Sequence, residues 1–364
     1  MKRAGAKRVA GPHHVASGGG GKGFMAPIGL AFERFTVTDL DLECGAVLPT
    51  ATIAYHLRGW GPHARPILTC SAFAQSYGDL SYLVDEEGAL AGWPVIHTEL
   101  LANGRSTSPS NTDAPYAGPS FPAVSVRDNV AMQQRLLDHL GVDRVAAVVG
   151  ASMGAQQALQ WAVTAPDRVG AVVAIAGNGR ASWQQRLFLN ALREALVSDP
   201  AFSDGRYAAP PLDGLARLSA AWAPWALSPM FFEAGEHQAY QDTQAQDIDG
   251  FLAKWRTRYF DRDANDLLSH LATWAAHDIG DSPSCEASFA SAAARATAPI
   301  LFLPIRTDAY FPPDLVAAEA GLFPNATVTV IESVSGHAAA FGRSPDDRAA
   351  ITAAMTDFLR SVTG

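Results

Sequence analysis

The segment VVGASMGAQQALQWA, residues 148–162, constrains the fold of this chain more than any other stretch. A run of small and β-branched residues leads into Gly150-Ala151-Ser152-Met153-Gly154, and a helix-forming sequence follows at once. This G-x-S-x-G pattern lets a strand turn sharply into a helix and holds the serine at the apex of the turn. Short matches also arise by chance in ordinary β–α loops with a capping serine. The rest of the chain therefore has to decide whether Ser152 is a nucleophile.

The bulk composition bounds the size of the core and the class of partner. The 364 residues are 48% hydrophobic, which suffices for one large domain or a core with an insertion. A net charge of −9 disfavours nucleic acid or an anionic membrane as the main partner. Cys44, Cys70 and Cys285 lack the spacing of a disulfide framework or a metal site, so we expect a reducing, cytoplasmic location and no metal.

Residues 1–24 are basic, rich in glycine and without an apolar stretch. A secretory signal needs an apolar region of about 7–15 residues, so we expect a disordered tail, with Met25 opening the folded part. Whether this tail belongs to the native protein stays open. No later stretch approaches the roughly 18 uncharged apolar residues of a membrane span, which predicts a soluble protein.

Strand patterns alternate with helix patterns along most of the chain. Residues 127–141 and 153–164 have helical spacing, and Ile351 and Met355 lie on the apolar stripe of a closing helix. Strands and helices in alternation predict a mostly parallel sheet with helices on both faces. The expected strands are the alternating or short apolar runs at 35–45, 51–59, 65–73, 93–101, 144–149, 169–176, 298–305 and 326–333.

Residues 180–296 have a different texture, helical throughout and rich in tryptophan. Five of the eight tryptophans lie here: Trp183, Trp222, Trp225, Trp255 and Trp274. A helical block inserted into an α/β sheet predicts a cap over an active site, the alternative being an extra layer of core packing. The chain is thus divided into a core at 25–179, a cap at 180–296 and the rest of the core at 297–364.

A serine hydroxyl is a weak nucleophile, so Ser152 needs a general base that is itself oriented by an acid. The G-x-S-x-G turn goes with the chain order serine, acid, histidine. Asp308 directly follows the expected strand at 298–305, and His337 directly follows the one at 326–333. Order and placement therefore predict a triad of Ser152, Asp308 and His337.

Two other acids are candidates for the acid of the triad. Asp314 lies further into the helix that follows Asp308, and Glu332 lies inside the expected last strand, so both fit less well. A single histidine in a loop is more often structural than catalytic. The agreement of three separate placements is what favours chemistry.

The negative charge that develops during acyl transfer needs backbone N–H donors. The N–H of Met153, directly after the serine, is one candidate. The second donor comes from the loop after an early strand, where LTCSAFAQS makes the N–H of Phe73 the candidate. The turn NGRSTSP at 103–109 is assigned no chemistry.

The segments VVGASMGAQQALQWAVTAPDRV, FPAVSVRDNVAMQQRLLDHLGV, TDAYFPP and SGH together resemble the homoserine O-acetyltransferases and their α/β-hydrolase relatives. The resemblance implies an α/β-hydrolase fold in which acyl-CoA acylates the serine and an alcohol then takes the acyl group. By position, Ser152 would be the nucleophile, Asp308 the orienting acid and His337 the base. It also implies no bound cofactor, acyl-CoA as a co-substrate of a transferase, and a homodimer formed through the cap.

The residues by which this family recognises homoserine are replaced here. Ser219 stands where the resemblance implies an arginine for the carboxylate, with Arg217 two residues earlier, and Ala338 stands where it implies an aspartate for the ammonium group. A serine cannot give the bidentate contact of an arginine. We therefore expect water as the acceptor and predict an ester or thioester hydrolase. An O-acyltransferase with another alcohol acceptor and a non-catalytic binding protein are the alternatives.

Overall fold

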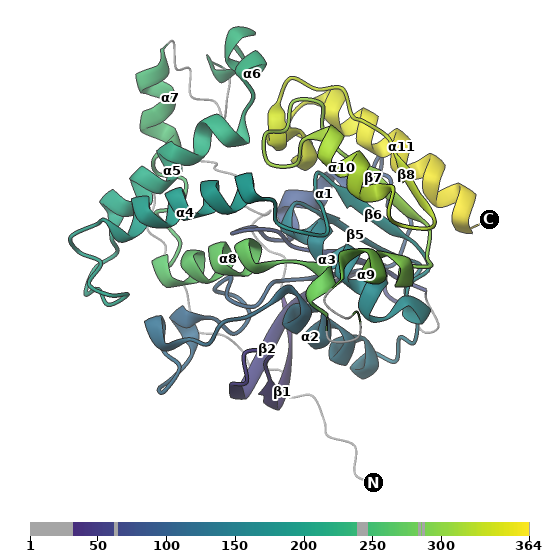
Figure 1. Ribbon diagram of the computed structural model, residues 1–364, viewed down its shortest axis with the longest axis horizontal. Helices are drawn as coiled ribbons and strands as arrows, with labels where there is room; N and C mark the ends of the chain where they lie inside the picture. Colours follow the sequence, from purple (N-terminus) through teal and green to yellow (C-terminus); the bar gives the residue numbers. More distant parts are fainter. Residues whose placement is uncertain (1–31, 62–64, 239–246, 283–284, 286–287, 364) are drawn as a thin grey trace.

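The computed structural model describes residues 32–61, 65–238, 247–282, 285 and 288–363. The expected tail at 1–24 and Met25 lie outside the described residues. The strands form one eight-stranded sheet in the order β1-β2-β4-β3-β5-β6-β7-β8 (Figure 1). The strands are β1 (Glu33–Asp41), β2 (Val47–Arg58), β3 (Ile67–Cys70), β4 (Val95–Thr98), β5 (Ala147–Ala151), β6 (Val172–Ile175), β7 (Ile300–Leu303) and β8 (Ala326–Val328).

The sheet is antiparallel at one edge and parallel elsewhere. β1 pairs with β2 and β2 with β4 in antiparallel fashion, and every pair from β4 to β8 is parallel. Parallel neighbours need crossover connections, and helices supply them. The mostly parallel sheet that the sequence predicts is confirmed.

Apolar side chains that alternate along the central strands form two hydrophobic cores, one on each face of the sheet. Val148 and Val172 belong to the core that also contains α2 and α3, whereas Val149 and Val173 belong to the core that contains α1 and α11. This alternation follows from the two-residue period of a strand, and both faces must be covered by helices. These four helices are α1 (Ser81–Val84), α2 (Val126–His139), α3 (Met153–Thr164) and α11 (Pro345–Thr363).

A block of helices is inserted between β6 and β7. Figure 1 shows α4 to α7 stacked at one end of the molecule, with α8 running back toward α3. The helices are α4 (Trp183–Val197), α5 (Leu212–Ala226), α6 (Pro229–Glu233), α7 (Ile248–Trp255) and α8 (Ala264–Ala276). A further helix of residues 180–296, α9 (Phe289–Arg295), does not belong to this stack but packs on α3 in the core.

Several strands are shorter than their apolar patterns. The last one, expected over 326–333, ends at Val328, and Ile331 continues the pairing only as an isolated bridge to Ile305. β8 is an edge strand with a single neighbour, so fewer hydrogen bonds define its end. In the described part of the chain, no helix is long and apolar enough to cross a membrane.

Candidate active site

Ser152 occupies a strained turn between β5 and α3. Its backbone has φ 55° and ψ −123°, a conformation that L-residues rarely adopt and that costs about 1–3 kcal/mol. The two flanking glycines make this turn possible. A Cβ on Gly150 would lie 2.1 Å from the carbonyl carbon of Gly154, and one on Gly154 would lie 2.4 Å from the carbonyl oxygen of Cys70. β5 and α3 therefore approach too closely for a side chain at Gly150, and α3 approaches the end of β3 too closely for a side chain at Gly154.

Asp308 and His337 meet across two loops at the carboxyl ends of β7 and β8. The Nδ1 atom of His337 lies 2.7 Å from Oδ2 of Asp308 in a buried hydrogen bond. The other carboxylate oxygen, Oδ1, accepts from the backbone N–H groups of Tyr310 at 2.7 Å and Phe311 at 3.3 Å. These bonds hold the carboxylate of Asp308 in place. The carboxylate in turn orients the imidazole of His337 through Nδ1, so that Nε2 is available for proton transfer.

The two alternative acids lie elsewhere. Glu332 is exposed and forms an ion pair with Arg306 at 2.7 Å, which lowers the pKa of that carboxyl. Asp314 is exposed in the first turn of α10 (Pro313–Ala320). Of the three acids considered, Asp308 is the one that contacts His337.

Ser152 and His337 line the same small cavity, which has a volume of about 60 Å³. Its walls come from the core, from α5 and from the segment around the end of α7. The other lining residues are Ala72, Phe73, Gln75, Trp222, Ala226, Trp255, Arg258, Tyr259, Ala338 and Phe341. A larger hollow of about 780 Å³, between the start of α2 and helix α8, contains neither Ser152 nor His337, so we place the chemistry in the smaller one.

The Phe73 loop brings a backbone donor to this cavity. Phe73 follows β3 in a turn closed by a hydrogen bond from Gln75 N–H to the Ala72 carbonyl at 3.1 Å. Within the described residues, the Phe73 N–H has no hydrogen-bond acceptor. Met153, whose N–H is the other predicted donor, is the first residue of α3. Phe73 lines the same cavity as Ser152, and Met153 directly follows Ser152 in the chain.

Of the three predicted substrate-binding residues, only Ala338 lines the cavity. Ser219 is fully buried in α5, and its hydroxyl has no partner among the described residues. Arg217 is exposed, and its Nε donates to the Ala195 carbonyl at 3.4 Å on the outside of the helical block. Neither side chain contributes to the cavity.

Sequence reasoning missed the charged and aromatic wall around the end of α7. The Arg258 guanidinium carbon lies 5.1 Å from the ring centre of Trp255 and 5.6 Å from that of Tyr259, and all three line the cavity. The helical pattern of residues 180–296 predicted the secondary structure but not which side chains line the cavity with Ser152. Among the described residues, no cluster of three His, Cys, Asp or Glu side chains could hold a metal ion.

Comparison with known proteins agrees with this architecture. A family model described as the alpha/beta hydrolase fold matches residues 65–342. The chain belongs to the alpha/beta hydrolase family. This alpha/beta hydrolase is 32% identical over 340 residues to the ethyl acetate hydrolase of Pseudomonas veronii, covering 91% of this chain and 96% of that protein. It is 33% identical over 335 residues to the homoserine O-acetyltransferase of Geobacter sulfurreducens, covering 82% and 90%.

A solved structure supports the same assignment. The structure of the acetyl esterase MekB superimposes on this alpha/beta hydrolase with a TM-score of 0.86 and 32% identity, covering 91% of this chain and 97% of that one. The resemblance to the homoserine O-acetyltransferase branch is confirmed. The chain is an enzyme that hydrolyses esters or transfers acyl groups.

Proposed function

We propose that this enzyme hydrolyses esters of short acyl groups, acetate above all, through an acyl-serine intermediate. Ser152 is the nucleophile, His337 the general base and Asp308 the residue that orients the base. The observation that carries the proposal is the shared cavity: Ser152 and His337 line it together, and His337 is held from behind by Asp308 at 2.7 Å.

The two half-reactions use the same three side chains. The Ser152 hydroxyl passes its proton to Nε2 of His337 as its oxygen attacks the ester carbonyl. The tetrahedral intermediate collapses, the ester C–O bond breaks, and the alcohol leaves with the proton from His337. Water then gives a proton to His337 and attacks the acyl-serine, releasing the carboxylic acid and restoring the hydroxyl. The backbone N–H groups of Phe73 and Met153 stabilise the negative oxygen in both steps.

The lining of the cavity supports water rather than homoserine as the acceptor. None of the described lining residues is an aspartate or glutamate, so the ammonium group of an amino acid would be buried without a charge partner. Burying an unpaired charge costs several kcal/mol, on the order of 3–5 kcal/mol. Ala338 supplies no charge, and Ser219 and Arg217 do not reach the cavity.

The size of the cavity supports a short acyl group. Its volume is about 60 Å³. A cavity needs about 10–15 Å³ to hold a single buried water, so only a few heavy atoms fit beside Ser152. The names of two similar proteins, ethyl acetate hydrolase and acetyl esterase, point the same way. The chemistry of Ser152 needs no metal or bound cofactor; acyl-CoA is a co-substrate only in the transferase alternative.

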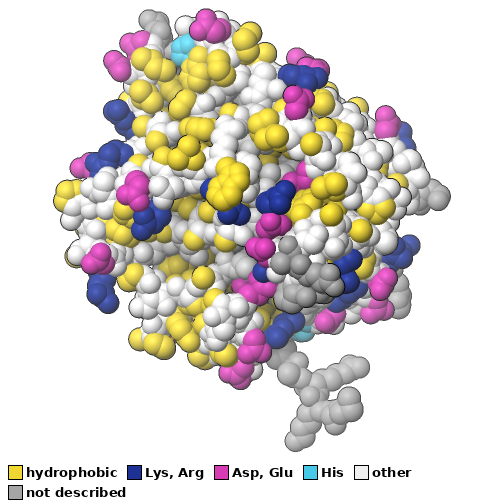
Figure 2. All heavy atoms as spheres, in the orientation of Figure 1, with side chains coloured by type: hydrophobic (Ala, Val, Ile, Leu, Met, Phe, Trp, Pro, Cys, Tyr) yellow, Lys and Arg dark blue, Asp and Glu magenta, His cyan; other side chains and the backbone are white. Residues whose placement is uncertain are grey.

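The surface supports a small-molecule substrate as well. On the face in Figure 2, acidic and basic side chains are interspersed, and the chain carries a net charge of −9. Such a surface does not favour nucleic acid. A cytoplasmic location and a homodimer formed through the helical block remain part of the proposal, and size-exclusion chromatography with light scattering tests the dimer.

The experiment that tests the proposal compares the wild type with Ser152→Ala on p-nitrophenyl acetate and on ethyl acetate. We expect hydrolysis by the wild type and a loss of at least about 10³-fold in the variant. Equal background hydrolysis by both proteins would contradict the serine mechanism. A folded protein that binds acetate esters without cleaving them would favour a non-catalytic binding protein.

The acyltransferase alternative is tested with acetyl-CoA in the presence and absence of homoserine. CoA release that is independent of homoserine agrees with a hydrolase. CoA release that rises with homoserine, together with the appearance of O-acetylhomoserine, would show a transferase and contradict our interpretation of Ala338.

A further inference from the structure

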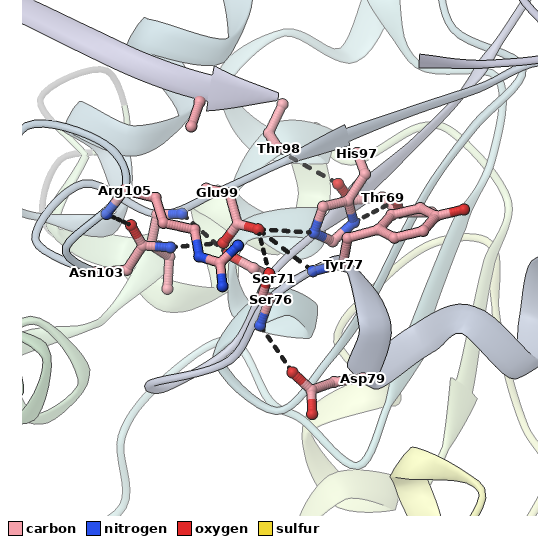
Figure 3. Close-up of polar contacts among 12 residues, drawn as sticks. Thr69, Ser71, Ser76, Tyr77, Asp79, His97, Thr98, Glu99, Asn103 and Arg105 are labelled. Carbon is pink, nitrogen blue, oxygen red and sulfur yellow. Dashed lines mark hydrogen bonds and ion pairs between the residues drawn. The ribbon is translucent and has the colours of Figure 1, made fainter. Parts of the chain in front are cut away.

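A buried carboxylate that the mechanism does not use lies directly after β4. Glu99 is 0% exposed. Figure 3 shows it between two loops, with hydrogen bonds to both. Its Oε1 accepts from the Ser76 hydroxyl at 2.7 Å and from the Tyr77 N–H at 3.3 Å, and its Oε2 accepts from the Asn103 side-chain amide at 2.5 Å. All three donors come from loops at the end of the sheet where Ser152 lies.

Among the described residues, the ionisable side chain that contacts Glu99 is His97. Nε2 of His97 lies 3.9 Å from its Oε1, but burial lowers the pKa of His97 to about 3, so this imidazole is neutral. Arg105 and Asp79 act on Glu99 in opposite directions at longer range. Burial dominates and raises the pKa of the Glu99 carboxyl to about 7. A carboxyl kept in such a place at a cost to stability needs an explanation.

Two of the three hydrogen bonds of Glu99, those from Ser76 and Tyr77, come from the end of the loop that carries Phe73. One end of this loop is anchored at Ser71, whose N–H donates to the Thr98 carbonyl at 3.0 Å and whose hydroxyl accepts from the Leu100 N–H at 2.9 Å. The other end is anchored at Ser76, which donates to Glu99. The segment after β4 therefore holds both ends of the loop that carries the Phe73 N–H.

We propose that Glu99 is a positioning residue for acyl transfer: by anchoring Ser76 and Tyr77, it holds the Phe73 N–H where the negative oxygen of the tetrahedral intermediate forms. The proposal rests on the proposed function, because the donor has a purpose only if Ser152 attacks an ester. Removing one such donor costs about 10²–10³-fold in kcat in other enzymes, and displacing it costs part of that.

The test uses a trifluoromethyl ketone with a methyl group on its other side. Ser152 adds to this ketone and forms a hemiketal oxygen that needs the same backbone donors, whereas the ground-state ester needs them less. The ratio of the inhibition constant of the ketone to the KM of p-nitrophenyl acetate does not depend on how much of a preparation is folded. A merely structural role of Glu99 would leave this ratio unchanged.

Glu99→Ala leaves Ser76 and Tyr77 without their acceptor. We expect kcat/KM to fall by roughly 10–100-fold and the ketone to bind more weakly by a similar factor. Glu99→Gln keeps a carbonyl oxygen toward Ser76 and Tyr77, so it should restore kcat/KM to within about threefold of the wild type. If Glu99→Ala does not fold, Ser76→Ala removes one of the same bonds and should change both constants in the same direction.

The matched control is Asp128, a second buried carboxylate that accepts from the Ser125 and Glu43 N–H groups at the start of α2, away from the cavity. Asp128→Ala should lower stability without changing the ratio of the two constants. Equal ketone binding by the wild type, Glu99→Ala and Ser76→Ala would overturn the proposal for Glu99. A wild type that does not hydrolyse the ester at all would instead overturn the proposed function.

Discussion

At the scale of single residues, the hydrogen bond between Asp308 and His337 determines which ring nitrogen carries the proton. An ionised Asp308 accepts from Nδ1–H at 2.7 Å, which leaves Nε2 free to take the serine proton. In Asp308→Asn, the amide would donate to Nδ1 and place the proton on Nε2. We expect kcat/KM for p-nitrophenyl acetate to fall by roughly 10⁴-fold with little change in folding.

The control for this variant is Glu332→Gln, which removes the exposed ion pair with Arg306. Solvent screens an exposed pair, so it contributes little to stability and activity should stay as in the wild type. A loss with Glu332→Gln equal to that with Asp308→Asn would mean that the wrong acid has been assigned to His337.

Glu99 also makes the stability of the enzyme depend on pH. Burial raises its pKa from the ordinary 4.5 to about 7, so between these pH values the folded chain binds this proton more tightly than the unfolded chain. The unfolding free energy from this group therefore falls as pH rises from 4.5 to 7, by an amount on the order of 3 kcal/mol. Glu99→Gln removes this decline.

Buried histidines act in the opposite direction over an overlapping range. Burial lowers the pKa of His270 to about 4 and that of His277 to about 3, so their contribution is lost as pH falls below 6.5. The measurement is therefore the difference between wild type and Glu99→Gln in urea unfolding at pH 5 and pH 8. A difference that does not change with pH would show that Glu99 has the same pKa in both states.

The contact between Asp308 and His337 was predictable from sequence, whereas the contacts of Glu99 were not. Asp308 and His337 each follow an apolar run, and the carboxyl ends of parallel strands meet at one edge of the sheet. Glu99 lies within the apolar run at 93–101, but nothing in ELLANG distinguishes a buried acceptor from a solvated carboxylate. Its contacts with Ser76 and Asn103 form only when the loops fold over it.

At the scale of elements, the side chain of His270 in helix α8 forms a hydrogen bond with the Phe73 loop. Nδ1 of His270 accepts from the Ala74 N–H at 3.2 Å, and its Nε2 lies 3.1 Å from the Leu101 carbonyl. A neutral ring with its proton on Nε2 makes both bonds. His270→Ala breaks this connection, so we expect kcat/KM for p-nitrophenyl acetate to fall by roughly tenfold as the loop loosens.

Thr273, one turn further along α8, is the control for His270. Its hydroxyl donates to the Val124 carbonyl at 2.7 Å and anchors the same helix to a different loop. Thr273→Val should therefore lower the melting temperature but leave kcat/KM near that of the wild type. If both variants lose activity equally, α8 acts through its general packing and not through the His270 bridge.

Element types were predicted better than element ends. Apolar runs marked every strand of the sheet, but β3 and β4 span four residues each, fewer than their runs. The pattern reports burial, and burial continues past the ends of β3 and β4 into Ser71 and Glu99, whose N–H groups donate to the carbonyls of Thr98 and Ala54. The apolar pattern is therefore longer than the strand that it marks.

At the scale of the whole molecule, the inserted helices close the space above Ser152. The core supplies Ser152, His337 and Phe73 to the cavity, whereas Trp222 from α5 and Tyr259 from the helical block line it from the inserted segment. The sequence predicted a cap over the site from the inserted helical block, the alternative being an extra layer of core packing. Trp222 lines the cavity and also packs within the block, because its ring lies 4.6 Å from Phe73 and 5.4 Å from Phe188.

The helical block should therefore set the length of the acyl group. Trp222→Ala removes a tryptophan side chain from the wall. We therefore expect kcat/KM for p-nitrophenyl hexanoate to rise at least about tenfold relative to that for the acetate, because a few additional methylenes can then be buried. Trp225→Ala is the matched control, because that ring packs on Phe188 at 4.7 Å and does not line the cavity. Truncating a buried tryptophan such as Trp222 costs about 3–5 kcal/mol, and Trp225 is partly buried, so both variants are assayed well below their melting temperatures. The result is expressed as the ratio of kcat/KM for the two substrates. An unchanged ratio in Trp222→Ala would place the acyl group elsewhere than against α5.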